Sequence, residues 1–143
     1  MTAIEIIKHH IGKEMTHSPS AYLNWLKPKV LAAEIGKLTL EYTIREEMGN
    51  AMGNLHGGVS AGIIDDLIGT TVYSLGEPQF YATINLHIDY FSAVKIGEKV
   101  IAESNIVKKG KQLINVECSI WNADKSRLVV RGQGSLLKTE LKK

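Results

Sequence analysis

The sequence predicts an α+β fold in which one long, buried helix packs against an antiparallel sheet. Apolar side chains cover most of the circumference of a predicted helix over residues 58–75, and a helix that is apolar nearly all round is buried. Segments in which apolar and polar residues alternate, as they do in half-buried strands, lie before and after this helix. The connections between successive strands are short enough for hairpins, which join antiparallel strands.

The first 28 residues predict a helical extension to this core. Thr2 and Glu5 form a capping-box motif. Apolar residues at helical spacing follow it, at Ile4, Ile7, Ile11 and Met15. Ser18-Pro19 is typical of a helix start with proline at the first helical position. We therefore expect a first helix behind Thr2 and a short second one that ends near Lys27-Pro28.

Strand signals account for most of the remaining chain. Gly36 separates two strands before the long helix, and turn signals at 109–110 and 122–124 separate those after it. The predicted strands span 30–35, 37–44, 82–90, 98–108, 112–121 and 128–138. In the strand over 82–90 we expect unbroken alternation. Its two faces would carry Ile84, Leu86 and Ile88, and Thr83, Asn85, His87 and Asp89, respectively.

Length, composition and charge restrict the classes of function. The 143 residues suit one core, so we predict a single domain over 1–143, with the helical extension at 1–28 and the core at 29–138. A formal net charge of +2 is too small to favour nucleic acid as a partner. No apolar run is long enough to predict a membrane partner, and no signal-peptide pattern is visible. The single cysteine, Cys118, favours a reducing compartment, so we expect a cytoplasmic protein.

The strongest chemical signal is the segment Asn50-Ala51-Met52-Gly53-Asn54-Leu55-His56-Gly57-Gly58, followed by Asp65. Two consecutive glycines at a helix start let the backbone approach a ligand and leave first-turn N–H groups unpaired. These donors, at the positive end of the helix dipole, suit a carbonyl oxygen that becomes negative. Asp65 adds a carboxylate two turns further on. This is the minimum set of groups for hydrolysing an ester or a thioester.

Asp65 lies on a helix stripe that is rich in small residues. The stripe contains Gly58, Ala61, Gly62, Asp65, Gly69 and Val72. Each interior glycine destabilises a helix by roughly 1 kcal/mol relative to alanine, so we expect close approach by another backbone. A carboxylate at such a seam can be catalytic, or it can be a structural group held by a salt bridge or by backbone N–H groups. We interpret Asp66, which projects further round the helix, as structural.

These motifs resemble the hotdog-fold acyl-CoA thioesterases, and within them the phenylacetate-degradation (PaaI-like) branch. The similarity covers about residues 37–138 and rests on Asn50, the His56-Gly57 turn, Asp65, and the strand motif Asn85-Leu86-His87-Ile88-Asp89-Tyr90-Phe91-Ser92. That strand motif often continues with proline after the serine, where this chain has Ala93. The resemblance implies a hotdog fold, with the sheet wrapped around the central helix. It also implies a homodimer, or a homotetramer built as a dimer of dimers.

The resemblance further implies roles in hydrolysis of an acyl-CoA thioester to a free acid and CoA. The Gly57 N–H would bind the thioester oxygen, and the Asn50 amide would either bind the same oxygen or hold the water. Asp65 would act as general base or as nucleophile. Thr83 matches a position where a small hydroxyl helps to orient the water. His56 either contacts the substrate or supports the turn. In such dimers the segment 50–58 of one subunit, called the oxyanion turn below, faces the carboxylate of its partner.

The phosphates of CoA require positive charge, and the densest basic group in the chain is Lys108-Lys109-Gly110-Lys111. We interpret this predicted hairpin tip, together with Gly58, as substrate-binding, and expect Gly110 to permit a left-handed turn. A solvated surface turn is the alternative. The histidines at 9, 10 and 17 form no ligand set at metal spacing, so neither a metal nor a cofactor is expected.

Other functions remain open. A non-catalytic acyl-CoA-binding or sensor domain on the same fold is disfavoured, because a binder gains nothing from Asp65 beside an uncharged thioester. A dehydratase would need a histidine paired with a carboxylate in a different arrangement, and a purely structural oligomer would not explain the glycine stripe. A serine triad is disfavoured because Gly-x-Ser-x-Gly is absent. We interpret Tyr22, Trp25, Tyr90 and Trp121 as core or interface aromatics.

Overall fold

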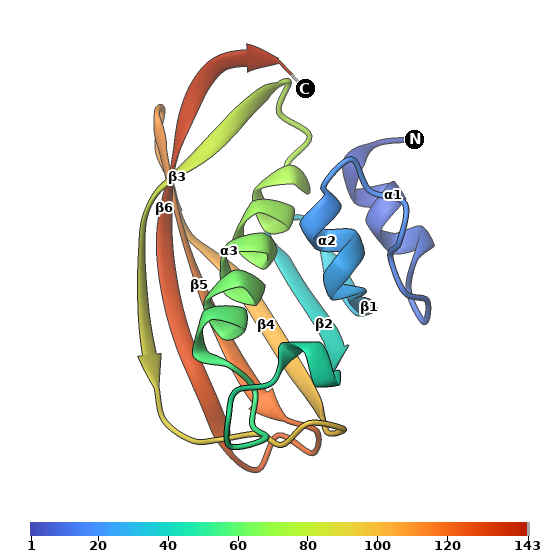
Figure 1. Cartoon of the computed structure of the whole chain (residues 1–143). Helices are drawn as coiled ribbons and strands as arrows, with labels where there is room; N and C mark the ends of the chain where they lie inside the picture. Colours follow the sequence, from blue (N-terminus) through green and yellow to red (C-terminus); the bar gives the residue numbers. More distant parts are fainter. Residues whose placement is uncertain (143) are drawn as a thin grey trace.

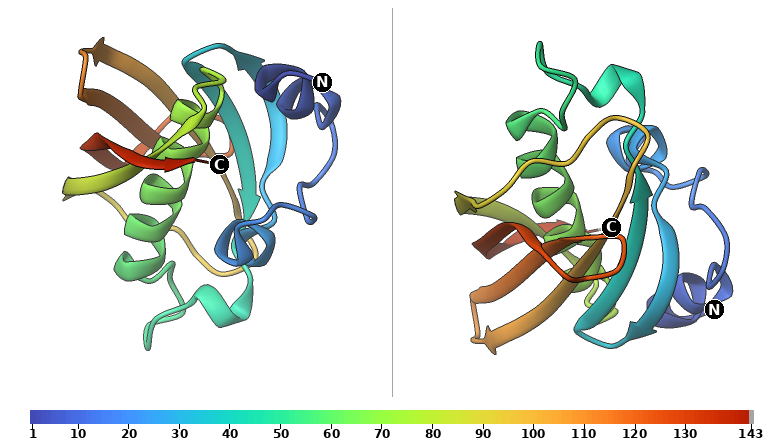
Figure 2. Two further views of the ribbon diagram at one scale, coloured as in Figure 1. Left: turned by 90° about the horizontal axis from the view of Figure 1, so that it is seen from above. Right: turned by 90° about the horizontal axis from the view of Figure 1, so that it is seen from below.

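A six-stranded sheet curves around one long helix in the computed structural model, which describes residues 1–142 (Figures 1 and 2). The helices are α1 (Ala3–His9), α2 (Ala21–Leu26), the 3-10 turn η1 (Glu46–Met48) and the long α3 (Gly57–Tyr73). The strands are β1 (Lys29–Glu34), β2 (Lys37–Thr43), β3 (Gln79–Tyr90), β4 (Lys99–Lys109), β5 (Leu113–Asn122) and β6 (Leu128–Lys142). All neighbouring strands are antiparallel, in the order β1-β2-β4-β5-β6-β3. The predicted α+β architecture is confirmed.

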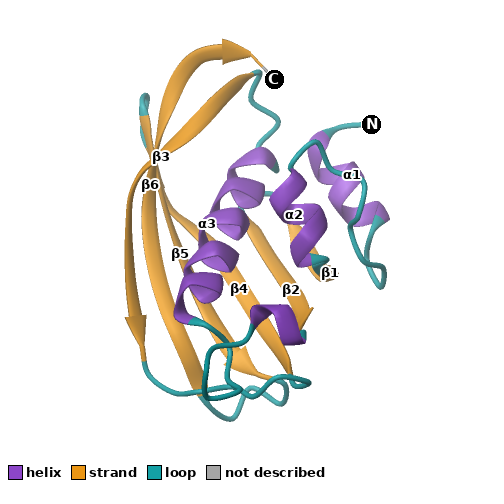
Figure 3. Cartoon of the chain, in the orientation of Figure 1, coloured by secondary structure: helices purple, strands orange, loops and turns teal. Residues whose placement is uncertain are grey.

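The core lies between α3 and the inner face of the sheet (Figure 3). The helix side chains that face it are fully buried, at Ile63, Ile64, Leu67 and Ile68. Two glycines of β6 let the helix come close to the sheet, because a Cβ at Gly132 would lie 2.9 Å from Ile64 and one at Gly134 would lie 3.1 Å from Ile68. Apolar burial of this kind contributes about 25 cal/mol per Å² and is the main force that holds α3 in the sheet.

The N-terminal extension is helical, but both of its helices are shorter than the sequence predicts. The Thr2 capping box is present and α1 ends at His9, so the segment after it runs beside β1 instead of continuing the helix. There the Gly12 N–H donates to the Val30 carbonyl, at 2.8 Å. The predicted start of α2 at Ser18-Pro19 is wrong: Ser20 is the N-cap. The Asn24 amide bonds both the N–H and the C=O of Ser18, which holds that residue in the loop.

The predicted unbroken alternation of β3 is also wrong. The pairing of β3 with β6 shifts between Thr83 and Asn85, so that one extra residue is accommodated as a β-bulge. A bulge reverses the phase of the side chains. Thr83 therefore points toward α3, where it bonds Asp65, whereas Ile84 is 52% exposed. After the bulge, Leu86 and Ile88 return to the helix side and pack against the core.

The two edges of the sheet differ. The edge of β1 is partly covered by residues 11–15, which form backbone hydrogen bonds with it. The outer edge of β3 has no strand beside it among residues 1–142, although β3 is 12 residues long. A long, uncovered edge strand is a ready site for pairing with another chain. No helix in the described part of the chain is long and apolar enough to cross a membrane.

Candidate active site

The start of α3 leaves one backbone donor available to a ligand. His56 is the N-cap: its Nδ1 accepts the Gly58 N–H at 2.8 Å, and its carbonyl accepts the N–H groups of Val59 and Ser60, both at 3.0 Å. The Gly57 N–H has no acceptor among residues 1–142. It is thus the unpaired first-turn donor that the sequence predicts at this position.

The cap also defines what His56 and Gly58 can offer. Because Nδ1 accepts a hydrogen bond, the neutral imidazole carries its proton on Nε2, and His56 is an exposed donor. The expectation of unpaired first-turn donors at both glycines is wrong for Gly58, because its N–H donates to His56. Gly58 can therefore offer a substrate only its backbone surface. A Cβ at Gly58 would lie 3.0 Å from Nδ1 of His56, so glycine is what allows the ring to cap the helix.

Asn50 is oriented by the loop that precedes the helix. Its Oδ1 accepts the N–H groups of Met52 (2.9 Å) and Asn54 (3.1 Å), and its own N–H donates to the Asn54 carbonyl at 2.7 Å. The acceptor side of the amide is therefore used internally. Its Nδ2 group donates to no residue in the described range, so it remains available as a second donor on the exposed turn.

Asp65 is an exposed carboxylate with one hydrogen-bond partner among the described residues. The Thr83 hydroxyl donates to its Oδ1 at 2.9 Å. Asp65 forms no ion pair within residues 1–142, so neither a salt bridge nor backbone N–H groups hold it in a structural role. Because Gly57 and Asp65 are eight positions apart on α3, they are separated by about 12 Å along the helix axis. One chain does not bring these two groups to one thioester carbon.

Asp66 lies in a different environment, which the sequence did not reveal. Burial, together with the negative charge of Asp65, raises the pKa of its carboxyl to about 7. Its Oδ2 is buried and has no hydrogen-bond partner within residues 1–142, and the same is true of the hydroxyl of Tyr42 on β2. The Tyr22 hydroxyl lies over Gly62, where a Cβ would be 2.0 Å from it. Within this chain a side chain of α2, not another backbone, therefore occupies the space at Gly62.

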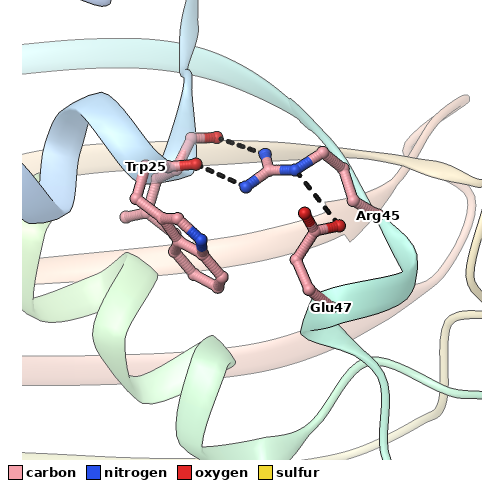
Figure 4. Close-up of polar contacts among 4 residues, drawn as sticks. Trp25, Arg45 and Glu47 are labelled. Carbon is pink, nitrogen blue, oxygen red and sulfur yellow. Dashed lines mark hydrogen bonds and ion pairs between the residues drawn. The ribbon is translucent and has the colours of Figure 1, made fainter.

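An arginine ties α2 to the segment that leads into the oxyanion turn (Figure 4). The Arg45 guanidinium donates to the carbonyls of Trp25 and Leu26 at the end of α2 and forms an ion pair with Glu47, at 3.5 Å. It also lies 5.1 Å from the centre of the Trp25 ring. A cation is favourable at a helix C-terminus because of the unpaired carbonyls there.

The hairpin tip formed by residues 108–111, called the lysine tip below, lies at the other end of α3 from the oxyanion turn in this chain. It joins β4 to β5, near the C-terminal end of the helix (Figure 1). Lys109 forms an ion pair with Glu77 at 3.0 Å, and this hydrogen-bonded carboxylate raises the pKa of the lysine. The expectation of a left-handed Gly110 is wrong, since its φ is not positive. The turn closes instead through the Gly110 N–H, which donates to the Leu113 carbonyl.

Within the described residues, no group of three or more His, Cys, Asp or Glu side chains is placed to hold a metal ion. The start of α3 carries a backbone donor, an amide and an imidazole, and the carboxylate of Asp65 with its hydroxyl partner lies two turns further along the same helix. They are uncharged donors plus one anion, which is a set suited to polarising a carbonyl and activating water.

A curved sheet around one long helix, with a free backbone donor at the helix start, defines a hotdog protein of the thioesterase type. Residues 52–129 match the sequence model of the Thioesterase superfamily, and the protein belongs to that superfamily. It is 26% identical to human acyl-coenzyme A thioesterase 13, over 93% of this chain and 95% of the relative.

Solved structures show the same fold. The PaaI protein of the E. coli phenylacetic acid degradation operon superposes with a TM-score of 0.79 at 18% identity, covering 87% of this chain and 88% of that one. A hypothetical thioesterase from Streptococcus pneumoniae, solved with coenzyme A, has a TM-score of 0.75 at 22% identity, covering 81% of this chain and 88% of that one.

Proposed function

We propose that this protein is an acyl-CoA thioesterase that hydrolyses the thioester to a free acid and CoA. The observation that carries the proposal is the unpaired Gly57 N–H at the start of α3 in a chain whose same helix presents the Asp65–Thr83 pair. Superfamily membership and the name of the human relative support it. The coenzyme A in the S. pneumoniae structure supports the choice of CoA as the carrier.

In the proposed reaction the thioester oxygen accepts hydrogen bonds from the Gly57 N–H and from Nδ2 of Asn50. The Thr83 hydroxyl occupies Oδ1 of Asp65, so the other carboxylate oxygen takes a proton from a water, whose oxygen attacks the carbonyl carbon. The tetrahedral oxyanion collapses, the C–S bond breaks, and the CoA sulfur leaves with the proton that Asp65 carries. Direct attack by Asp65 would instead break the C–S bond with departure of the CoA thiolate and form a mixed anhydride, which water then opens to the free acid and the restored carboxylate.

The site is proposed to be composite and the protein to be a homodimer or a dimer of dimers. The separation of Gly57 from Asp65 along one helix requires the two groups to come from different chains if they act on one carbon. The uncovered edge of β3 supports pairing with a second copy, which would extend the sheet. Thr83 lies on that strand, so pairing there would bring the Asp65 of each chain toward its partner.

We propose that CoA bound at one oxyanion turn also contacts the second subunit, near the C-terminal end of that subunit's α3. Two antiparallel helices related by a two-fold axis place the C-terminal end of one beside the N-terminal end of the other. The tip of one subunit, formed by Lys108, Lys109, Gly110 and Lys111, would then lie near the oxyanion turn of the other, with Gly58 beside the thioester. His56 would add its Nε2 donor there. We also propose a cytoplasmic location, which the unpaired thiol of Cys118 supports.

The test is release of thiol from a panel of acyl-CoAs that varies in chain length and in aromatic or aliphatic character. Asp65→Asn should lower kcat by at least about 10²-fold, as expected for loss of a general base. Asp89→Asn, which removes an exposed carboxylate whose hydrogen-bond partner within residues 1–142 is His87, is the control and should retain activity. Binding of acyl-CoA without turnover of any member of the panel would instead identify the non-catalytic acyl-CoA binder.

A further inference from the structure

The peptide between Gly57 and Gly58 is hydrogen-bonded at both of its polar atoms by side chains. Its carbonyl accepts the Tyr90 hydroxyl at 2.7 Å, and its N–H donates to Nδ1 of His56 at 2.8 Å. In a trans peptide the C=O and the N–H lie in one plane and point in opposite directions. The two side chains therefore hold this peptide from opposite sides.

A restraint is needed at this position because the peptide lies between two glycines. Glycine lacks the Cβ that restricts φ and ψ, so a Gly-Gly peptide rotates more easily than others. His56 belongs to the same turn and would move with it. Tyr90 is 33 positions further along the chain, on β3. It is the contact that ties this peptide to the sheet.

The ring of Tyr90 also contacts Gly57. A Cβ at Gly57 would lie 3.3 Å from Cε1 and 3.4 Å from both Cζ and the hydroxyl oxygen of Tyr90. Contacts at that distance are tighter than side chains ordinarily make, so Gly57 is the residue that lets the ring lie where its hydroxyl reaches the carbonyl. The Tyr90 ring thus lies in space that a side chain at residue 57 would otherwise need.

We propose that Tyr90 is a positioning residue for the oxyanion donor. The Gly57 N–H belongs to the preceding peptide and shares the Cα of Gly57 with the restrained one. The two peptides are joined at this Cα, where glycine leaves φ and ψ little restricted, so holding the second peptide in place limits the orientations that the first can adopt relative to the sheet. Donors act on a developing oxyanion only when they are held in place before reaction. The inference rests on the proposed role of Gly57 in thioester hydrolysis.

Tyr90→Phe removes the hydroxyl and keeps the ring. Loss of a whole oxyanion donor lowers kcat by about 10²–10³-fold, and we expect a misdirected donor to lower it by roughly tenfold. KM and the affinity for a non-hydrolysable thioether analogue should stay within about twofold of wild type, because the interaction strengthens only in the transition state. The matched control is Thr139→Val, which removes a hydroxyl-to-carbonyl bond at the other end of β3, to Phe80.

A second measurement reports on the peptide itself. The NMR order parameters of the Gly57 and Gly58 amides should fall in Tyr90→Phe and stay unchanged in Thr139→Val. Unchanged order parameters in Tyr90→Phe overturn the inference, as does wild-type kcat in that variant, or a loss of kcat that Thr139→Val reproduces. Asp65→Asn is measured alongside. Full turnover in Asp65→Asn contradicts the proposed function, whereas an inactive Asp65→Asn beside a fully active Tyr90→Phe contradicts only the role of Tyr90.

Discussion

The Gly57 N–H and the Asp65 carboxylate belong to one helix and are separated by about 12 Å along its axis. Each has the local environment that its proposed role requires: the donor is unpaired, and the carboxylate is exposed and bonded to Thr83. In the proposed composite site, this distance means that each chain would contribute one of the two groups to each site. Two antiparallel copies of α3 would complete two such sites, one at each end of the helix pair.

The composite site predicts complementation between two inactive chains. Asp65→Asn and Asn50→Ala should each be nearly inactive alone, since every site in either homodimer lacks one group. After subunit exchange, mixed dimers contain one intact site. An equimolar mixture should thus recover roughly a quarter of wild-type activity, because half of the dimers are mixed and each has one complete site of two. The measurement is thiol release after exchange verified by mass spectrometry. No recovery would mean that each site forms within one chain.

Removing charge from the lysine tip should weaken the binding of CoA without affecting the chemical step. Replacing Lys109 and Lys111 by alanine should raise KM for acyl-CoA severalfold and leave kcat nearly intact, because uniform binding is lost. The effect should shrink as salt is added, since exposed charges are screened. Short thioesters without the nucleotide should be hydrolysed as by wild type. Lys125→Ala is the control, because it removes another hairpin lysine in an ion pair, with Glu103 at 2.9 Å. Unchanged acyl-CoA kinetics at low ionic strength would identify the tip as a solvated turn.

Asp66 predicts a pH-dependent stability. Burial and the nearby charge of Asp65 raise its pKa from 3.8 to about 7 in the folded protein, so the folded state binds the proton more tightly than the unfolded chain. This group therefore lowers stability as the pH rises from about 4 to about 7, and its effect is constant above that range. Asp66→Asn should match wild type near pH 4 and be more stable by roughly 4 kcal/mol above pH 7, since the shift of about three pKa units corresponds to about 1.4 kcal/mol per unit.

Urea unfolding at a fixed protein concentration, at several pH values, measures this difference. Asp89→Asn, on the exposed side of β3, should show no comparable dependence. A difference between Asp66→Asn and wild type that is the same at pH 4 and pH 8 would contradict the assignment. It would indicate that the carboxyl of Asp66 keeps one protonation state throughout.

The sequence by itself determined the elements whose signals are local. Apolar periodicity located α3 and the strands to within a few residues, because the hydrogen bonds of a helix and the alternation of a strand repeat over short stretches. The oxyanion turn was predictable for the same reason. His56 caps Gly58 only two positions away, and Asn50 closes its loop onto Met52 and Asn54. The clearest chemical motif was therefore visible without a fold.

The tertiary structure decided the features that depend on distant partners. The bulge at Thr83 comes from the register of β3 against β6, which an alternating sequence does not encode, and it turns the Thr83 hydroxyl to Asp65. The contact of Tyr90 with Gly57 and the burial of Asp66 likewise require the sheet to close around α3. Local periodicity determines where a helix or strand forms. Only packing determines which side chains then meet, because those contacts join residues that are far apart in the chain.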